Sequence, residues 1–508
     1  MSQDVEQELD NEFVQAMQVI EHKDPAKRSV EDDCMLASYY FMLSQGQDRE
    51  RLQQALDIFL RHGVTLYESP IWNYHVGMCY YYLRQPEAAM RFLDKAKRDA
   101  EYGNTCAQYL QSCIDMLQLP VFSHNFTERC QECYKKLLAE QLPLIKAIKE
   151  QYQSPTGISK ELKEQVTKLL HYAFARVSFS LTCTKESDES VLEPTITLEP
   201  MGNVARALQM RYFIAHAPHE LTALLKIRLG LPYDPKFALN FGKTKIGLAN
   251  VNCFISKRND DYHVYLHCAQ LKNLLKEDFY VAYKMMLDLA NSALGEIAAL
   301  TQRVTFDMLF DLKAPDNAIA GPISLDKLRE HLISLGVALN KSDKELFESS
   351  YRDYEKEKEA VKSETDEAIK CTILPDRSDI VKGYSRCFQL INEFKGHDYR
   401  LTDELHENGA LAGYFAFEGE KIFSVNSPIN FEDFLDKIHN ALCDDLATDS
   451  AVLVGQATGS NYYYIDFIAW DLTLVLERVV TLFTQYQVPL YFATFRSIVP
   501  PITLSSER

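Results

Sequence analysis

The chain has 508 residues, of which 46% are apolar and 25% charged, a composition typical of a globular protein with several hydrophobic cores. Its formal charge of −18 argues against a nucleic-acid partner, because a phosphate backbone has to be faced by lysine and arginine. Such a charge suits a basic protein partner, mainly by steering its approach.

The sequence predicts a cytoplasmic chain that does not associate with membranes. No apolar run approaches the roughly 20 residues of a membrane-spanning helix. The N-terminal residues, MSQDVEQELDNEF, lack the basic start and apolar centre of a signal peptide. The 12 cysteines are scattered and stand in apolar contexts such as Met78-Cys79-Tyr80, which indicates reduced and mostly buried thiols.

Residues 1–153 are predicted to form an all-α domain of helix pairs. Cys34–Ser44 with Gln53–Phe59 is interpreted as a first pair, joined by a long loop. Thr105–Leu117 with Thr127–Leu138 is interpreted as a third. Three stacked pairs are just enough to bury a continuous core.

The middle pair, within Pro70–Glu101, shows the clearest pattern. Pro86 is placed to open its second helix, where the missing N–H costs nothing. Small residues let the two helices approach closely and larger ones fill the groove between them. The residues of this pattern are Gly77, Tyr80, Ala89, Leu93 and Ala96.

This spacing resembles a tetratricopeptide repeat, a helix–turn–helix unit that binds other proteins. With its flanks, the resemblance covers roughly a fifth of the chain. It implies a helical-repeat architecture for residues 1–153 and a protein-binding role for that domain.

Residues 154–340 are predicted to form an α+β domain. After the polar segment Ser154–Gly157 the apolar period changes to two, which is typical of strands. Strands are predicted at Phe237–Phe241, Ile246–Ser256, Tyr262–Cys268 and Arg303–Phe310, and helices at Val204–Ala215, Glu277–Leu300 and Ser324–Leu335.

Residues 341–368 are dense in charge and are predicted to be a solvated helix or a linker. Residues 369–508 are predicted to form a second α+β domain. Its strands are expected at Leu411–Phe417, Ala451–Gln456, Tyr462–Trp470 and Pro489–Phe495, and its helix at Leu472–Tyr486. The predicted fold class is therefore multidomain: an all-α helical-repeat N-terminal domain followed by two α+β domains.

Both α+β segments have the same element order: strand, turn, aromatic-rich strand, helix, strand. Either the two domains are related, or ββαβ is simply a common unit. The closing halves of the two segments carry two further patterns: Leu294-Gly295-Glu296 at the end of a long helix, and Gly455–Asp466 (GQATGSNYYYID). They resemble uncharacterised bacterial α+β domains found near toxin–immunity loci. That resemblance implies an immunity-type role and identifies no functional residue.

The strand Tyr262–Cys268 carries the most specific candidate for chemistry. Because successive strand side chains point to opposite faces, His263 and His267 share one face with Tyr265. Two imidazoles ~7 Å apart can hold a metal ion with a third ligand, such as Glu296 or Asp260. The alternative is that the histidines are polar residues on a solvent or interdomain face, while Val264, Leu266 and Cys268 pack inward.

Aromatic side chains with a polar handle are favoured at binding surfaces. Such residues occur in the first helix of the middle pair and on the predicted strand Tyr462–Trp470. The candidate partner contacts are Trp72, Tyr80, Tyr462, Tyr464, Asp466 and Trp470. The alternative interpretation is that these rings cover helices of their own domain.

We interpret the sequence as a bacterial-type cytoplasmic interaction protein, an adaptor or an immunity-type protein, which binds a protein partner without a cofactor or a reaction of its own. The acidic charge suits a basic partner. The alternative function is a metal-dependent or hydrolytic enzyme with its site around His263 and His267.

The domain boundaries generate a first prediction. The charge-dense segment Asn340–Ala368 has few apolar anchors, and Ser154–Gly157 is polar. We expect limited proteolysis, followed by mass spectrometry of the fragments, to cut first in one of these two segments. Early cleavage inside Tyr262–Phe310 or Tyr462–Phe495 would contradict this domain map.

Overall fold

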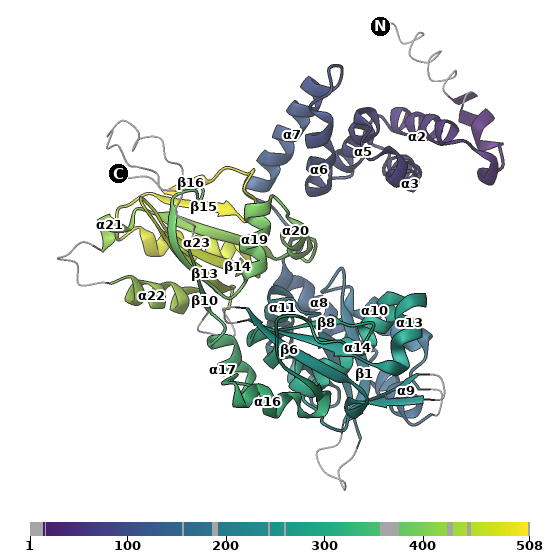
Figure 1. Ribbon diagram of the computed structural model, residues 1–508. Coiled ribbons are helices and arrows are strands. Elements are labelled where there is room, and N and C mark those ends of the chain that lie inside the picture. The colour runs from purple at the N-terminus through teal and green to yellow at the C-terminus, as the bar shows by residue number, and fades with distance from the viewer. Residues whose placement is uncertain are drawn as a thin grey trace, which may run out of the picture. The chain divides into compact units, whose positions relative to one another are not determined.

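The computed structural model describes residues 14–15, 17–154, 157–184, 192–241, 244–258, 261–355, 375–423, 430–443 and 449–505. Contacts group the chain into two compact units. Unit 1 comprises Met1–Val121 and Arg496–Ile502, and unit 2 comprises Phe122–Phe495 and Thr503–Arg508. The predicted fold class is confirmed, because stacked helices are followed by mixed α/β regions with several sheets (Figure 1).

The described part of unit 1 is built from paired helices. Several of them begin at a capping residue or a proline. At the start of α2, the Ser29 hydroxyl and the Asp32 carboxylate each accept a backbone N–H of the other residue at 3.0 Å, and Pro70 and Pro86 open two further helices. The elements are the 3-10 helix η1 (Pro25–Lys27), α2 (Val30–Ser44), α3 (Arg49–Arg61), α4 (Gly63–Leu66), α5 (Pro70–Tyr82), α6 (Pro86–Ala96) and α7 (Gly103–Gln118).

The predicted pairing of α5 with α6 is confirmed by a close helix crossing. A Cβ built on Gly77 would lie 2.8 Å from Leu93 Cγ and 3.2 Å from the Leu93 backbone nitrogen, so only glycine fits there. Ala89, Leu93 and Ala96 are fully buried. Helices α2 and α3 form a further pair, and α6 also packs against α7. A hydrophobic core that includes Leu36, Leu52, Leu56, Phe59, Trp72 and Val76 joins α2, α3 and α5.

Unit 2 begins with helices that pack on a small sheet. The helices are α8 (Phe126–Ala139), α9 (Gln141–Tyr152), α10 (Lys160–Leu170), α11 (Val204–Ala215) and α12 (His219–Thr222). The sheet has the order β1-β2-β3, with β1 (Ser178–Thr184) antiparallel to β2 (Glu193–Glu199), and β2 parallel to β3 (Lys226–Leu229). Helix α9 contacts β1 and β2.

A four-stranded sheet, ordered β8-β7-β6-β9, forms the next part of unit 2. Its strands are β6 (Asn252–Arg258), β7 (Asp261–His267), β8 (Val304–Met308) and β9 (Ala318–Ser324), and a separate hairpin pairs β4 (Ala238–Phe241) with β5 (Thr244–Gly247). The helical elements around them are η2 (Leu248–Asn250), η3 (Ala269–Leu271), α13 (Lys272–Glu277), α14 (Phe279–Leu294), α15 (Glu296–Thr301), η4 (Leu325–Lys327) and α16 (Leu328–Ser334).

Two sequence predictions for this region were wrong in detail. The single strand Ile246–Ser256 is divided between β5 and β6 by η2. The single helix Glu277–Leu300 is broken at Gly295, whose φ of +87° ends α14 and starts α15. This break places Glu296 at the start of a new helix.

A seven-stranded sheet, ordered β10-β11-β13-β14-β12-β15-β16, lies near the C-terminal end of the chain. Its strands are β10 (Arg352–Glu355), β11 (Ile380–Ser385), β12 (Leu411–Phe417), β13 (Ala451–Gly459), β14 (Tyr463–Ala469), β15 (Leu490–Thr494) and β16 (Ile502–Ser505). The accompanying helices are α17 (Asp343–Glu348), α19 (Phe388–Gly396), α20 (Arg400–Glu407), α21 (Gly419–Ile422), α22 (Phe431–Cys443) and α23 (Leu472–Phe483).

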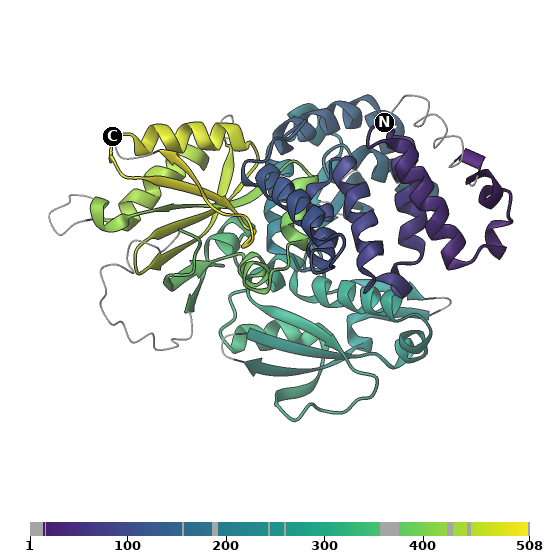
Figure 2. The same ribbon diagram turned by 90° about the horizontal axis from the view of Figure 1, so that it is seen from above.

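Helices cover both faces of this sheet, which explains why every residue of β12 is buried. Phe417 contacts Phe434 of α22 and Phe483 of α23, with ring centroids 5.3 and 5.2 Å apart, so these two helices lie side by side on one face (Figure 2). Tyr414, on the opposite face of β12, contacts Phe394 of α19 at 6.2 Å.

The ββαβ order predicted for both α+β segments is present, but the two sheets close it differently. In the first, β8 returns from α14 and α15 and pairs in parallel with β7. In the second, β15 returns from α23 and pairs with β12, which lies between β14 and β15. Strand β12 therefore separates β14 from β15, whereas no strand separates β7 from β8.

Part of the charged segment 341–368 is ordered. Residues 343–348 form α17, in which Leu346 and Phe347 are buried, and residues 352–355 form β10. Residues 356–368 of that predicted linker lie outside the described residues. Among the helices that the structure describes, none is long and apolar enough to cross a membrane.

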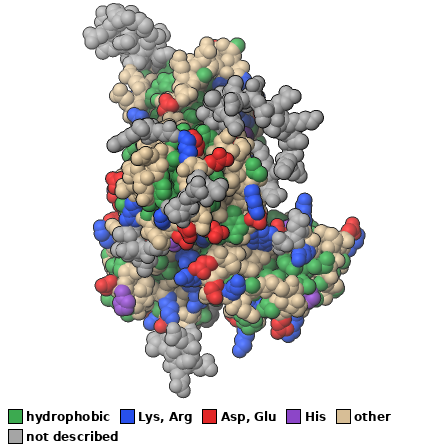
Figure 3. Space-filling model, turned by 90° about the vertical axis from the view of Figure 1, so that its left-hand side faces the viewer, with side chains coloured by type: hydrophobic (Ala, Val, Ile, Leu, Met, Phe, Trp, Pro, Cys, Tyr) green, Lys and Arg blue, Asp and Glu red, His purple; other side chains and the backbone are tan. Residues whose placement is uncertain are grey.

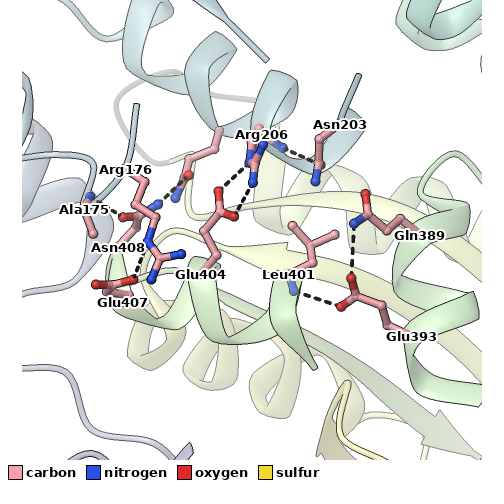
Figure 4. A network of polar contacts seen from close by, with 11 residues as sticks. Ala175, Arg176, Asn203, Arg206, Gln389, Glu393, Leu401, Glu404, Glu407 and Asn408 are labelled. Atoms are coloured by element: carbon pink, nitrogen blue, oxygen red, sulfur yellow. Dashed lines mark hydrogen bonds and ion pairs between the residues drawn. The ribbon is translucent and has the colours of Figure 1, made fainter. Parts of the chain in front are cut away.

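A polar network joins the α11 region to the α20 region within unit 2 (Figure 4). Asn408 Oδ1 accepts the Ala175 N–H at 2.7 Å, and Asn408 Nδ2 donates to Gln209 Oε1 at 3.0 Å. Arg206 donates twice to Glu404, at 2.5 and 2.6 Å. Asn408 is 1% exposed, so both hydrogen bonds are needed to offset the cost of burying its amide.

The α5–α6 crossing generates a second prediction. Ala89 is fully buried in α6, whereas its neighbour Ala88 is half-buried. We expect Ala89→Leu to lower the free energy of unfolding by about 1–3 kcal/mol, because the added atoms overpack the crossing. Ala88→Leu, on the same helix, should change it by less than about 0.5 kcal/mol. Equal melting temperatures for the two variants in circular dichroism would contradict the close crossing.

Candidate functional site

The first candidate surface is a row of aromatic rings on α2, α5 and α7 in unit 1. Phe41 of α2 lies 6.2 Å from Tyr82, whose hydroxyl is 3.1 Å from that of Tyr109. Tyr109 also packs edge-to-face on Tyr81 at 4.7 Å. All of these rings are half-buried. We call the set the tyrosine belt; its members are Phe41, Tyr74, Tyr81, Tyr82, Tyr102 and Tyr109.

His75 joins the two parts of the belt, the rings next to Phe41 and those next to Tyr74, so the row of rings is continuous. The ring centroid of His75 lies 5.6 Å from Phe41 and 5.1 Å from Tyr74, and Tyr74 stacks on Tyr102 at 4.7 Å. Burial lowers the pKa of His75 to about 4, so this linking imidazole is neutral at pH 7.

The belt is uncharged at neutral pH. The hydrogen bond to Tyr109, together with burial, raises the pKa of Tyr82 to about 12, and burial raises the pKa of Tyr74. Helix α5, PIWNYHVGMCYYY, contains neither lysine or arginine nor aspartate or glutamate. A surface of neutral phenols gives a partner apolar ring faces and hydroxyl groups.

The sequence-predicted contacts Trp72 and Tyr80 lie inside the helix packing. Trp72 is 3% exposed and its indole N–H donates to the Phe59 carbonyl at 3.0 Å. Tyr80 stacks on Phe92 of α6 with centroids 5.5 Å apart. Because Tyr80 faces α6, Tyr81 and Tyr82, the next two residues of α5, point in other directions. The helical phase of Gly77 and Tyr80 was the signal in the sequence that could have identified Tyr81 and Tyr82.

The four candidates near β14 also pack against their own unit. Tyr464, Asp466 and Trp470 are at most 2% exposed, and Tyr462 is half-buried against Tyr491 at 5.8 Å. Their contact with a partner stays a prediction, but the structure does not gather them into one exposed surface.

Asp466 forms a buried ion pair that sequence reasoning missed. Arg377 donates to Asp466 and to the Tyr354 hydroxyl, the latter at 2.6 Å. The Arg377 guanidinium lies 5.2 Å from the Tyr414 ring centroid and 5.1 Å from that of Phe495. A charge buried among aromatic rings needs this pairing, so Asp466 holds the segment around Arg377 onto the sheet.

The histidine strand has the predicted alternation, since Val264, Leu266 and Cys268 are fully buried. His263 Nδ1 lies 2.7 Å from the Thr305 hydroxyl on β8. His267 is 9% exposed, and its Nδ1 lies 3.3 Å from the Leu309 carbonyl oxygen. His267 is therefore more buried than a solvent-facing strand residue, because the chain that continues from β8 packs beside it.

The metal alternative gains no geometric support in the described region. Within those residues, no group of three or more histidine, cysteine, aspartate or glutamate side chains is placed to hold a metal ion. Asp260, one proposed third ligand, lies outside the described residues. The other, Glu296, is engaged elsewhere: its Oε2 accepts the Leu231 N–H at 3.0 Å, and its Oε1 the Met201 N–H at 3.2 Å.

Glu296 belongs to a buried acidic cluster around one lysine. Lys284 donates to Glu199 at 2.8 Å and to Asp288 at 2.5 Å. Burial raises the pKa of Glu296 to about 7, with Glu199 adding to the rise and the two backbone N–H groups and Lys284 opposing it. A carboxyl group that titrates near neutral pH is characteristic of functional sites.

Comparison with known proteins identifies no relative: no family model matches the chain, and no match is found among curated proteins or solved structures.

The raised pKa of Glu296 generates a third prediction. The folded state keeps this proton up to about pH 7, whereas the unfolded chain releases it near pH 4.5. The proton therefore stabilises the fold fully below about pH 4.5, and this contribution is lost as the pH rises through 7. The parent should have a higher free energy of unfolding than Glu296→Gln at pH 5, and urea titrations should show this difference decreasing by about 2–3 kcal/mol between pH 5 and pH 8.

The glutamine variant is a suitable reference because it has nearly the same size and cannot titrate. It is expected to be less stable than the parent at pH 5, since it cannot accept both backbone N–H groups as the carboxyl does. A stability difference that is constant with pH would show that Glu296 titrates at its ordinary value.

Proposed function

We propose that the chain is a protein-interaction protein whose helical unit binds an extended segment of a basic partner protein along the tyrosine belt. The observation that carries this proposal is the continuous, half-exposed row of neutral aromatic rings on α2, α5 and α7. Tyrosine is enriched at binding hot spots because it supplies a large contact area and a hydroxyl at low entropic cost.

The helix packing supports a repeat-type interpretation. The close α5–α6 crossing at Gly77 and Leu93 is what the resemblance to a tetratricopeptide repeat implies. In this proposal the first helix of each pair presents the belt, while the second helix buries its apolar face against the first. The charged residues of α3 and α6 then serve solubility rather than recognition.

The charge of the chain supports a basic partner. On the face shown in Figure 3, lysine and arginine side chains are interspersed with aspartate and glutamate, so the support comes from the formal charge of −18 and not from a patch of one sign. Long-range attraction would speed association. Aromatic faces also accept cations: Lys95 Nζ lies 3.1 Å from the Tyr67 ring centroid in unit 1.

An immunity-type version of this proposal makes the partner a toxin. It rests on the resemblance carried by Gly455–Asp466 and on the acidic charge. An adaptor would bind its partner through the same belt, so one test of that surface applies to both versions of the proposal.

A displayed library of random peptides, selected on the immobilised full-length chain, tests the proposal and gives a fourth prediction. Peptides that combine lysine or arginine with an apolar residue should be enriched. Their affinity, measured by fluorescence anisotropy, should fall about tenfold or more in Tyr81→Ala, because truncating an aromatic hot spot costs about 2 kcal/mol or more and about 1.4 kcal/mol already corresponds to tenfold. The association rate should fall with added salt.

The matched control is Tyr280→Ala, which removes an 83% exposed tyrosine in unit 2. It should leave peptide affinity unchanged. Circular dichroism establishes that both variants are folded. If no peptide is enriched, if the enriched peptides are not basic, or if both variants bind equally well, the proposal is wrong.

A further inference from the structure

Unit 2 contains a cavity of about 420 Å³ that the proposed protein-binding role does not use. It is lined by α14, α15 and β8 on one side, and by β10 and the start of α19 on the other; Figure 1 labels α14, β8, β10 and α19. The residues that matter for its chemistry are Glu296, Arg303, Phe306, Arg352, Arg386 and Phe388.

Three guanidinium groups and two carboxyl groups line this cavity in a chain whose formal charge is −18. Arg303 Nε lies 3.2 Å from Asp261 Oδ1, and Arg352 Nη1 lies 3.8 Å from the same oxygen. Arg352 also donates to the Thr301 carbonyl at 2.9 Å. One carboxylate oxygen therefore lies close to two cationic groups of the cavity wall.

The third guanidinium is held by an aromatic stack. Arg386 lies 4.0 Å above the centroid of the Tyr351 ring and donates to the Tyr351 hydroxyl. Tyr351 stacks on Tyr384 at 5.3 Å and donates to the Leu453 carbonyl at 2.9 Å. Arg386 Nε is buried and has no hydrogen-bond partner among the residues that the structure describes. A buried, oriented donor without an acceptor is what an anion site requires before its ligand arrives.

We propose that this cavity binds a small organic phosphate, with the phosphate group at the three arginines. The guanidinium fork matches phosphate oxygens, and a tetrahedral anion accepts donors from several directions; Arg303, Arg352 and Arg386 line the cavity from separate elements. Phe306, Phe388 and Tyr283, all half-buried, provide an apolar wall for the rest of the molecule. The volume falls within the range of sites for metabolite-sized ligands.

The neighbouring carboxyl groups do not oppose this assignment. Asp261 is paired with two of the arginines, and the pKa of Glu296 is raised to about 7 mainly by burial, so its negative charge is reduced at neutral pH. Glu296 also directs both oxygens at the backbone N–H groups of Met201 and Leu231.

Isothermal titration calorimetry of the full-length chain tests the site and gives a fifth prediction. The ligands are AMP, inorganic phosphate, adenosine and citrate. AMP should bind more tightly than inorganic phosphate, since it adds contact with the aromatic wall. Adenosine, which lacks the phosphate charge, and citrate, whose charged groups are all carboxylates, should bind at least about tenfold more weakly than AMP.

Two substitutions at the exposed Thr305, which lines the cavity on β8, form a pair that is matched in size and differs in charge. Thr305→Glu should weaken AMP binding about tenfold, because it places a carboxylate beside Arg303. Thr305→Gln introduces a side chain of the same size as glutamate without the charge, so it should have little effect. Arg386→Gln should weaken AMP binding more than Thr305→Glu does. The control Arg400→Gln removes a guanidinium that is 78% exposed and should change nothing.

The proposal does not depend on Arg386→Gln remaining folded, since the Thr305 pair leaves the core untouched. It is overturned if the parent chain binds neither AMP nor phosphate at millimolar concentration. Tighter binding of citrate or adenosine than of AMP also overturns it, as does equal AMP affinity in the two Thr305 variants.

Discussion

The arrangement of unit 2 depends on a buried amide, Asn408. Its side chain is 1% exposed and is satisfied by Ala175 and Gln209, which lie more than 190 residues earlier in the chain. Gly409, next to it, has a φ of +78°, and a Cβ there would lie 2.5 Å from the His124 carbonyl oxygen. The Phe126 N–H then donates to the Gly409 and Trp470 carbonyls, at 2.9 and 3.1 Å. These contacts bind the start of β12 to the helices that precede the first sheet, so that 122–495 forms one unit.

The sequence predicted best what is determined locally. The α5–α6 pair depends on residues within about one helical turn of a crossing, and the alternation of Val264 and Leu266 depends on the period of a single strand. Predictions failed where one residue or a distant partner decides. A single φ at Gly295 divides a helix whose apolar spacing continues across the break. The burial of Trp72 and Trp470 also follows from neighbours that no spacing reveals, while their contact with a partner stays a prediction.

The candidate sites differ in how far they could be predicted. The tyrosine belt lies within α2, α5 and α7, so knowing that Tyr80 faces Phe92 of α6 suffices to orient Tyr81 and Tyr82. The arginine cavity combines Arg303, which directly precedes β8 of the four-stranded sheet, with Arg352 on β10 and Arg386 just after β11 of the seven-stranded sheet. The acidic residues near these arginines in the sequence give no sign of a cationic site, because the charge along the chain does not determine the charge around a cavity.

The break at Gly295 connects the fold of unit 2 to the chemistry of its cavity. Had α14 continued, residue 296 would extend the same helix and could not reach two backbone segments at once. The left-handed glycine instead turns the chain, so that Glu296 accepts N–H groups from the loops at Met201 and Leu231 and closes one side of the cavity. Glutamate suits this place better than glutamine, because a carboxyl group offers acceptors on both oxygens. The same burial that makes these hydrogen bonds strong also raises the pKa of Glu296, so a carboxyl group that titrates near neutral pH follows from a structural role.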